Sequence, residues 1–188
     1  MTKLFDHFTS DDHERFMQEA YNMKRFSHDL RTQTGAVIVE PKNMKIIGRG
    51  TNRLPIDLTQ ESIKSFNDPE FLKFFNLKYK LDVLPNDIST DDGLQKFLNS
   101  EIKYIAFQHA ERGAIANAAK NGKSTKNCVM YATYYPCAPC ASSIIEAGIK
   151  LLAVPEQPDF SHTKWGLDWK LAEKLLAQAK LETLFLNR

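Results

Sequence analysis

The chain has few cysteines, almost no net charge and no long hydrophobic run, and each absence excludes a class of protein. Lys and Arg number 25 and Asp and Glu 23 among 188 residues, which leaves a net charge of +2. Because nucleic acids are bound through clustered positive charge, this near-zero net charge argues against a nucleic-acid partner. No apolar run approaches the about 20 residues of a membrane span, and residues 1–16 are too polar for a signal peptide, so we expect a cytoplasmic protein without membrane contact.

What the chain does contain is typical of one globular domain. Hydrophobic residues make up 43% and charged residues 26% of the sequence. A chain of this size can bury roughly 70% of its surface, which is enough for a core without disulfides. Two of the three cysteines, Cys137 and Cys140, are three positions apart. This spacing favours metal binding or redox chemistry in a reducing compartment over a disulfide framework.

Apolar runs alternate with helical patterns along most of the chain. Asp11 and Asp12 are natural caps for a first helix. We expect strands at 35–40, 44–50, 128–133, 149–154 and 183–186, and further helices at 109–121, 137–147 and 165–180. This alternation predicts an α/β fold, a three-layer α/β/α sandwich with a mixed central sheet of about five strands.

Residues 54–108 do not follow the alternation, so we describe the chain as a single domain, 1–188, with an insertion there. The insertion has no convincing strand and is rich in phenylalanine. Its nine Asp and Glu against six Lys give −3, which leaves +5 on the rest of the chain. A bare loop of this length is rare in a compact domain, so we expect short helices. The insertion either packs on the domain or on a second subunit, or forms a lid over a ligand.

Two motifs carry the candidate chemistry: His109-Ala-Glu111 and Pro136-Cys137-Ala-Pro-Cys140. Each motif opens a predicted helix, where the positive helix terminus lowers thiol pKa values and favours thiolates. One nitrogen and two sulfur ligands suit Zn²⁺ and leave the fourth position open, as in catalytic zinc sites. Glu111 is placed to act as the general acid and base rather than as a ligand. H-x-E followed by P-C-x-x-C is a signature of zinc nucleobase deaminases.

Other interpretations of these residues remain. A lone C-x-x-C could be a redox pair or half of a structural zinc site, but a structural site needs a fourth protein ligand. Cys128 lies in an apolar strand and is read as a core residue. The remaining histidines lie in polar stretches and are expected to be solvated: His7, His13, His28 and His162. Trp165 and Trp169 at i and i+4 indicate a helix packed on the sheet, or an oligomer contact if that face is exposed.

With these motifs the chain resembles the cytidine and deoxycytidylate deaminase superfamily, most closely its deoxycytidylate (dCMP) deaminase branch. The resemblance covers nearly all of the chain outside the insertion. Besides the zinc motifs it includes Ser27-His-Asp29, Thr34–Val39, Gly48–Asn52 with Pro55, Lys103-Tyr104, Thr133 and Ile144–Ile149. The resemblance implies a cytidine deaminase-like fold, zinc, and hydrolytic deamination of a pyrimidine nucleotide, dCMP to dUMP. It also implies a homo-oligomer, a dimer or a hexamer.

The resemblance further implies substrate contacts. Asn52 would hold the sugar or the base edge, although an Asn after a Gly-x-Gly turn is equally a turn residue. The Ala110 backbone would contact the base. Tyr135 would stack on the ring or else belong to the core.

The phosphate of a nucleotide needs cationic partners. Arg53 and Lys103 are our candidates, with Arg49 a further one, since a guanidinium pairs bidentately with phosphate. Isolated surface arginines are often only solvated. Arg112 would face either the substrate or a second subunit, and Gly113 stands where relatives usually have asparagine.

Two rival functions stay open. The chain could deaminate another substrate, such as cytidine, guanine or a tRNA adenosine, although the lack of a basic stripe argues against tRNA. It could also be a zinc-stabilised binding module without turnover. Glu111 argues against the second rival, because a purely structural zinc site has no use for that carboxylate.

Overall fold

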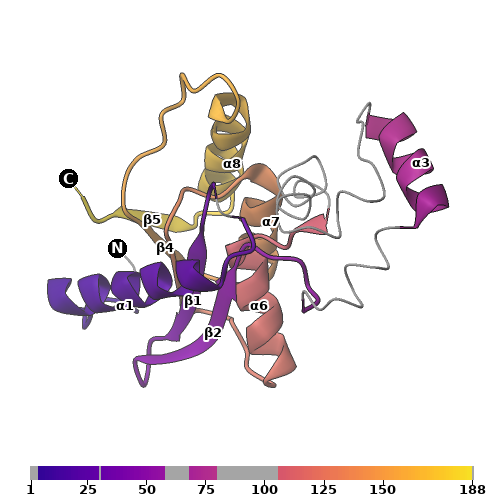
Figure 1. The fold of residues 1–188 in the computed structure, drawn as a ribbon. Helices are drawn as coiled ribbons and strands as arrows, with labels where there is room; N and C mark the ends of the chain where they lie inside the picture. The colour runs from indigo at the N-terminus through magenta and orange to yellow at the C-terminus, as the bar shows by residue number, and fades with distance from the viewer. Residues whose placement is uncertain (1–3, 30, 58–67, 80–105, 188) are drawn as a thin grey trace. The chain divides into compact units, whose positions relative to one another are not determined.

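The computed structural model describes residues 4–29, 31–57, 68–79 and 106–187, and Figure 1 shows how their helices and strands are arranged. The chain divides into two compact units. The first comprises Met1–Ser27, Gln33–Asn52 and His109–Arg188, and the second comprises His28–Thr32 and Arg53–Gln108. The second unit contains the whole segment 54–108. That this segment is an insertion into a single domain stays a prediction.

Five strands of the first unit form one mixed sheet in the order β2-β1-β3-β4-β5. The strands are β1 (Gly35–Glu40), β2 (Lys45–Thr51), β3 (Val129–Ala132), β4 (Leu151–Val154) and β5 (Glu182–Phe185). β1 pairs antiparallel with β2 and β3, whereas the β3–β4 and β4–β5 pairs are parallel. The predicted mixed sheet is confirmed.

Helices cover both faces of the sheet, as the ribbon in Figure 1 shows. They are α1 (Ser10–Met23) on one face, and α6 (Ala110–Lys120), α7 (Ala138–Glu146) and α8 (Gly166–Gln178) on the other. Val37 and Val39 of β1 belong to the core under α1, while Ala36 and Ile38 belong to the core under α6–α8. Side chains that alternate between two covered faces are expected of a buried strand. The three-layer α/β/α sandwich is therefore confirmed.

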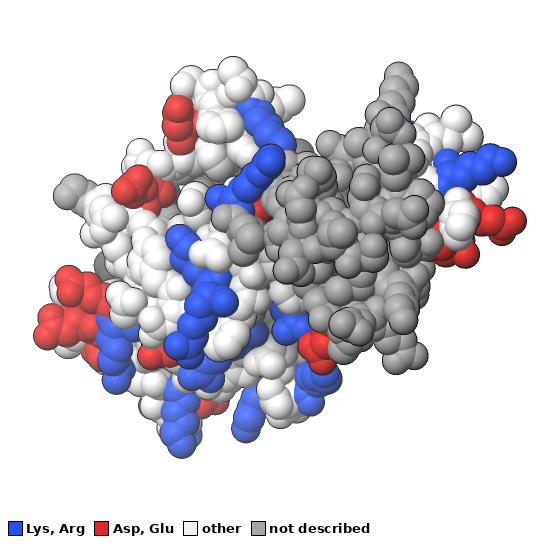
Figure 2. Space-filling model, in the orientation of Figure 1, with Lys and Arg blue, Asp and Glu red and all other residues white. Residues whose placement is uncertain are grey.

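The first helix begins with a capping box that the sequence prediction placed incorrectly. We expected Asp11 or Asp12 to cap the helix, but Thr9 is the N-cap, and its hydroxyl accepts the backbone N–H of Asp12. The Asp12 carboxylate in turn accepts the Thr9 backbone N–H. Figure 2 shows acidic side chains gathered where α1 begins, at the left edge. Negative charge in the first turn complements the helix dipole.

Gly48 and Gly50 lie inside β2, within the strand predicted at 44–50. A Cβ atom at Gly50 would lie 2.0 Å from the Ala110 carbonyl oxygen, and one at Gly48 would lie 2.4 Å from that of Ala114. Both carbonyls belong to α6. The two glycines therefore let α6 pack directly on the backbone of the edge strand, which holds the start of that helix close to the end of β2.

Within the second unit, α3 (Pro69–Tyr79) is a helix of the kind we expected in residues 54–108. The Asp68 carboxylate accepts the Phe71 backbone N–H, and Pro69 begins the helix. An acidic cap followed by Pro is a common helix start. Phe74 and Leu77 are 71% and 79% exposed. Residues 58–67 and 80–105 lie outside the described part, and a lid role stays a prediction.

Two further sequence expectations concern His and Cys side chains. Cys128 is buried, as expected of a core residue. His13 is not solvated: it is 8% exposed and its Nδ1 lies 2.8 Å from the Tyr131 hydroxyl. Nδ1 of His28 is also buried. The expectation was wrong here because α1 turns His13 toward the sheet, although its sequence neighbours are polar. None of the helices in the described residues is long and apolar enough to span a membrane.

Candidate metal centre and active site

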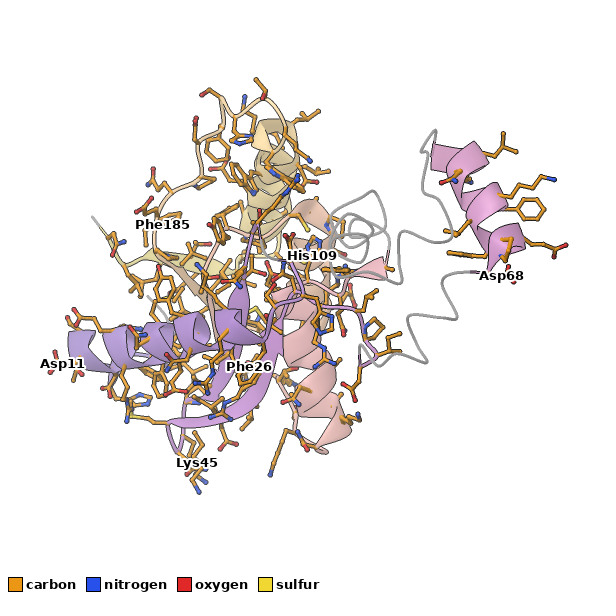
Figure 3. All side chains as sticks on the ribbon, in the orientation of Figure 1. Asp11, Phe26, Lys45, Asp68, His109 and Phe185 are labelled. Atoms are coloured by element: carbon orange, nitrogen blue, oxygen red, sulfur yellow. The ribbon has the colours of Figure 1, made fainter. Side chains whose placement is uncertain are left out.

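Two helix N-termini bring three metal-binding side chains together. His109 is the N-cap of α6, Cys137 is the N-cap of α7, and Cys140 lies in the first turn of α7. Nδ1 of His109 lies 3.4 Å from the Cys137 sulfur and 3.5 Å from the Cys140 sulfur. The three ligand atoms all lie within 4.8 Å of one another. Figure 3 labels His109 at the start of α6, where this cluster forms.

The separations and the chemistry of the donors fit zinc. A thiolate sulfur about 2.3 Å and a nitrogen about 2.0–2.1 Å from a tetrahedral zinc ion are about 3.6 Å apart. The observed Nδ1–Sγ distances of 3.4 and 3.5 Å are close to this value. Three protein ligands leave one position open, which is the catalytic type of site.

The interaction between the two neighbouring thiol groups shifts their pKa values in opposite directions. The Cys140 thiol and the nearby His109 lower the pKa of Cys137, although burial acts in the opposite direction. The Cys137 thiol, together with burial, holds the pKa of Cys140 above its usual range. The hydrogen bond to Cys137 also raises the pKa of His109. A metal at this position would displace these protons, so metal affinity must depend on pH.

Glu111 is a buried carboxyl group beside the metal-binding cluster. It lies in the first turn of α6, two residues after His109, and is 7% exposed. Burial raises the pKa of Glu111, and the charge of His109 partly offsets this effect. A carboxyl group whose pKa is moved toward neutrality can take up and release protons during a reaction.

Asn52 lies at the end of β2, directly after Thr51, and is 8% exposed. Its Oδ1 accepts the Ser27 hydroxyl at 2.7 Å and the Thr34 backbone N–H at 2.8 Å. The amide, at the carboxyl end of β2, is therefore held by two residues that precede β1 in the chain. With its oxygen used in this way, the side chain could approach a ligand only through its nitrogen, as a donor.

Ala110 and Tyr135, our other candidates in the first unit, both lie in the core. Ala110 is 1% exposed at the first position of α6. Tyr135 is 9% exposed, stacks on Phe185 with ring centroids 6.4 Å apart, and has its pKa raised to about 12 by burial. The structure thus places Tyr135 against the core. Its role toward a substrate ring stays a prediction, as does that of the Ala110 backbone.

The candidate cation Arg53 is hydrogen-bonded within its own loop. Arg53 belongs to the second unit, where Nε donates to the Leu54 carbonyl and Nη2 to the carbonyl of Ile56 and the carboxylate of Asp57. These bonds hold Arg53 within its own loop, so its assignment to phosphate stays a prediction. Lys103 lies outside the described residues.

Two arginines of the first unit remain to be placed. Arg49 is exposed on β2, and its backbone N–H donates to Asn117. Arg112 is half-buried on α6, and its Nε is buried with no hydrogen-bond partner among the described residues.

Sequence reasoning missed two residues that hold candidate site residues in place. Ser27 belongs to a motif noted above but was assigned no role, although its hydroxyl holds Asn52. Asp168 lies between the two tryptophans of α8, and its carboxylate accepts the backbone N–H of Ala138, next to Cys137. Both partners are distant in sequence, by 25 and 30 residues. A local pattern therefore carries no signal for either contact.

A mixed α/β/α sheet with His, two Cys and a buried Glu at helix starts defines the class of zinc-dependent nucleobase deaminases. Residues 10–155 match the model of the family described as "Cytidine and deoxycytidylate deaminase zinc-binding region". The chain belongs to this family of deaminases, which confirms the resemblance inferred from its motifs. Zinc binding is a property of that family region.

Known relatives of the chain carry related names. A protein of Aliivibrio fischeri described as an uncharacterised deaminase is 28% identical over 173 residues, or 92% of each chain. Human deoxycytidylate deaminase is 34% identical over 137 residues. This alignment covers 73% of the present chain and 60% of the human protein.

Solved structures share the fold. The dCMP deaminase of cyanophage S-TIM5 in its apo form superimposes with a TM-score of 0.60 at 18% identity, covering 95% of this chain and 99% of the phage chain. The same phage enzyme in complex with dCMP and dUMP gives a TM-score of 0.59 at 20% identity, covering 94% and 98%. The predicted cytidine deaminase-like fold is thereby confirmed.

Proposed function

We propose that this chain is a zinc-dependent hydrolase that converts dCMP and water to dUMP and ammonia. The convergence of His109, Cys137 and Cys140 beside the buried Glu111 is the observation that carries the proposal. The relatives named deoxycytidylate deaminase support the choice of substrate.

The three ligands and Glu111 would divide the chemistry between them. His109, Cys137 and Cys140 would hold zinc, which supplies a Lewis acid that activates water near neutral pH. Glu111 would accept a proton from that water and deliver it to N3 of the cytosine ring. It would then take the second proton of the water and pass it to the departing amine. Oxygen ends on C4, one proton on N3 and the other on ammonia, so the reaction balances.

The remaining candidates would position the nucleotide. Asn52 would donate from its amide nitrogen to the sugar or base edge, since two donors occupy its oxygen. The Ala110 backbone and Tyr135 would lie along the base. Arg53 and Lys103 would neutralise the 5′-phosphate, which is why we favour a nucleotide over a nucleoside. For Arg53 this role requires release of its bonds within the 53–57 loop.

The test of the reaction is Glu111→Gln. We expect this variant to keep one equivalent of zinc but to lose ammonia release by at least about 10²-fold, the usual scale for a missing acid–base group. The exposed Glu14→Gln is the matched control and should keep full activity. Retained turnover in Glu111→Gln would refute the mechanism, and a wild-type protein without zinc would refute the metal site.

The test of the substrate is a deamination screen of the purified protein. We expect kcat/KM for dCMP to exceed that for deoxycytidine, cytosine, guanine and tRNA adenosine. Equal rates on dCMP and deoxycytidine would remove the phosphate from the proposal, and zinc binding without turnover on any substrate would favour the binding module. The expected homo-oligomer, a dimer or hexamer, stays a prediction that light scattering can check, and so does the cytoplasmic location.

A further inference from the structure

A carboxylate of α8 reaches the first residue of the helix that carries both cysteines. Oδ2 of Asp168 lies 3.0 Å from the backbone nitrogen of Ala138 and accepts its N–H. Ala138 is the first residue of α7 and directly follows Cys137. Asp168 itself is half-buried in the first turn of α8. A single carboxylate therefore serves the N-termini of two helices.

The start of α7 needs such an acceptor from outside. The first N–H groups of a helix have no partner within the helix, and the side chain of an N-cap residue reaches only those of the second or third residue. At α7 the N-cap is Cys137, whose side chain makes no capping hydrogen bond. Pro139 has no N–H group, and the N–H of Ala141 is already bonded to the Cys137 carbonyl at 2.9 Å. Asp168 supplies the acceptor for Ala138.

The same contact restrains the backbone beside the Cys137 sulfur. The peptide group between Cys137 and Ala138 has its carbonyl bonded to Ala141 and its N–H bonded to Asp168. With both ends held, this peptide plane cannot rotate without breaking a hydrogen bond. Its orientation sets ψ of Cys137, which is 164°, and so the direction in which the Cα–Cβ bond carries the sulfur.

From this geometry we infer that Asp168 is a positioning residue for the metal centre, which holds Cys137 in the orientation that allows metal binding. The inference rests on the proposed zinc site. Residues behind the ligands of a metal commonly orient them, and their loss weakens metal binding by about 10- to 100-fold. Here the orientation is imposed on the backbone of the ligand, through the neighbouring peptide, rather than on the sulfur itself.

The test compares Asp168→Ala, which removes the acceptor, with Asp168→Asn, which keeps an acceptor oxygen of the same reach but no charge. Each purified variant is stripped of metal and titrated with cobalt(II), and zinc affinity is measured by competition with a chelator. We expect Asp168→Ala to weaken zinc binding by about 10-fold or more and to alter the thiolate-to-cobalt absorption. Asp168→Asn should restore most of both. The matched control is Asp11→Ala, an exposed Asp in the first turn of α1.

A capping role alone would give a different result. If Asp168→Ala lowers the melting temperature but keeps wild-type zinc affinity and cobalt spectrum, the inference is overturned. If Asp168→Ala does not fold, Asp168→Leu takes its place in the test, because Leu keeps the volume of the side chain but has no acceptor. Failure of both to fold while Asp168→Asn folds would also overturn the inference, because the acceptor oxygen at position 168 would then serve folding. A wild-type protein that binds no zinc would instead refute the proposed function.

Discussion

Asn52 has its amide oxygen held by two donors, and this limits what the side chain can offer to a ligand. The Ser27 hydroxyl also lies 3.1 Å from the Asn52 carbonyl oxygen, so it contacts both the side chain and the backbone of Asn52. Thr34 contributes its backbone N–H, which no substitution of its side chain removes. Ser27 is therefore the contact that mutation can test.

We predict that Ser27→Ala raises KM for the nucleotide more than it lowers kcat, because Asn52 then loses one of its two donors. A neutral hydrogen bond contributes about 0.5–1.5 kcal/mol, which corresponds to roughly a 2- to 12-fold effect. Ser27→Thr keeps the hydroxyl and should restore KM, and the exposed Ser161→Ala is the control. Steady-state kinetics would contradict the role of Asn52 if KM were unchanged in Ser27→Ala.

His13 makes the free energy of unfolding depend on pH, because its pKa in the folded state differs from that in the unfolded chain. Burial lowers the pKa of His13, and the nearby Asp12 offsets this only in part. The folded protein therefore binds the proton less readily than the unfolded chain, whose histidines titrate near about 6.5. The contribution of His13 to the free energy of unfolding is complete above about pH 6.5, the pKa in the unfolded chain. It is lost as the pH falls toward the lowered pKa of the folded state.

We predict that the free energy of unfolding of the wild type decreases from pH 7 to pH 5, and that His13→Asn flattens this dependence. Urea unfolding at several pH values measures the difference between the two proteins. His7→Asn, which changes an exposed histidine, is the matched control. Parallel pH profiles for wild type and His13→Asn would assign the acid sensitivity to other groups.

At the scale of elements, the contact of α6 with β2 decides where the metal cluster forms. Gly50 of β2 lies under the first turn of α6, which also carries Glu111. Gly113, on the helix side of this contact, is different: a Cβ there would meet its nearest atom at 3.4 Å, an ordinary contact distance. Gly50 is therefore required for the close approach of α6 to β2, whereas Gly113 only lowers the helix propensity of α6.

We predict that Gly50→Ala destabilises the protein by about 1–3 kcal/mol or more, as overpacking does, and weakens zinc binding because the start of α6 must move. Gly113→Ala should instead be neutral or stabilise by up to about 1 kcal/mol, the helix preference of Ala over Gly. Denaturant unfolding and metal titration measure both effects. Equal stabilities of the two variants would contradict the close packing of α6 on β2.

At the scale of the whole molecule, the metal would join two helices that share the core on one face of the sheet. His109 comes from the start of α6 and both cysteines from the start of α7. A ligand that binds only the folded state stabilises it by about 3–4 kcal/mol when its free concentration exceeds Kd by 100- to 1,000-fold.

We predict that removing zinc with a chelator lowers the melting temperature and that zinc restores it. The double variant Cys137→Ser/Cys140→Ser should already melt low and should not respond to the chelator. Cys128 is buried outside the cluster, so Cys128→Ala should keep the full response to zinc. A melting temperature independent of zinc in the wild type would contradict a metal that bridges the two helices.

Elements could be predicted from the sequence because their signals are local. Strands of apolar residues and helices between them follow from periodicity, and the ends were off by no more than two residues in the sheet. The errors came where a distant partner decides the outcome. His13 lies in a polar stretch but points at Tyr131, and the helix cap, a local error, is Thr9 rather than Asp11 or Asp12.

For the site, the sequence by itself determined which residues could bind a metal and which carboxyl could move protons. The spacings of His109 with Glu111 and of Cys137 with Cys140 are short enough to lie on single helix starts, so the donor types and their local placement are encoded locally. Only the tertiary structure decided that the two helix starts meet within hydrogen-bonding distance, that Ser27 holds Asn52, and that Asp168 holds the peptide after Cys137. These contacts join segments 25 to 31 residues apart, and they form because the elements that carry the segments pack around one sheet.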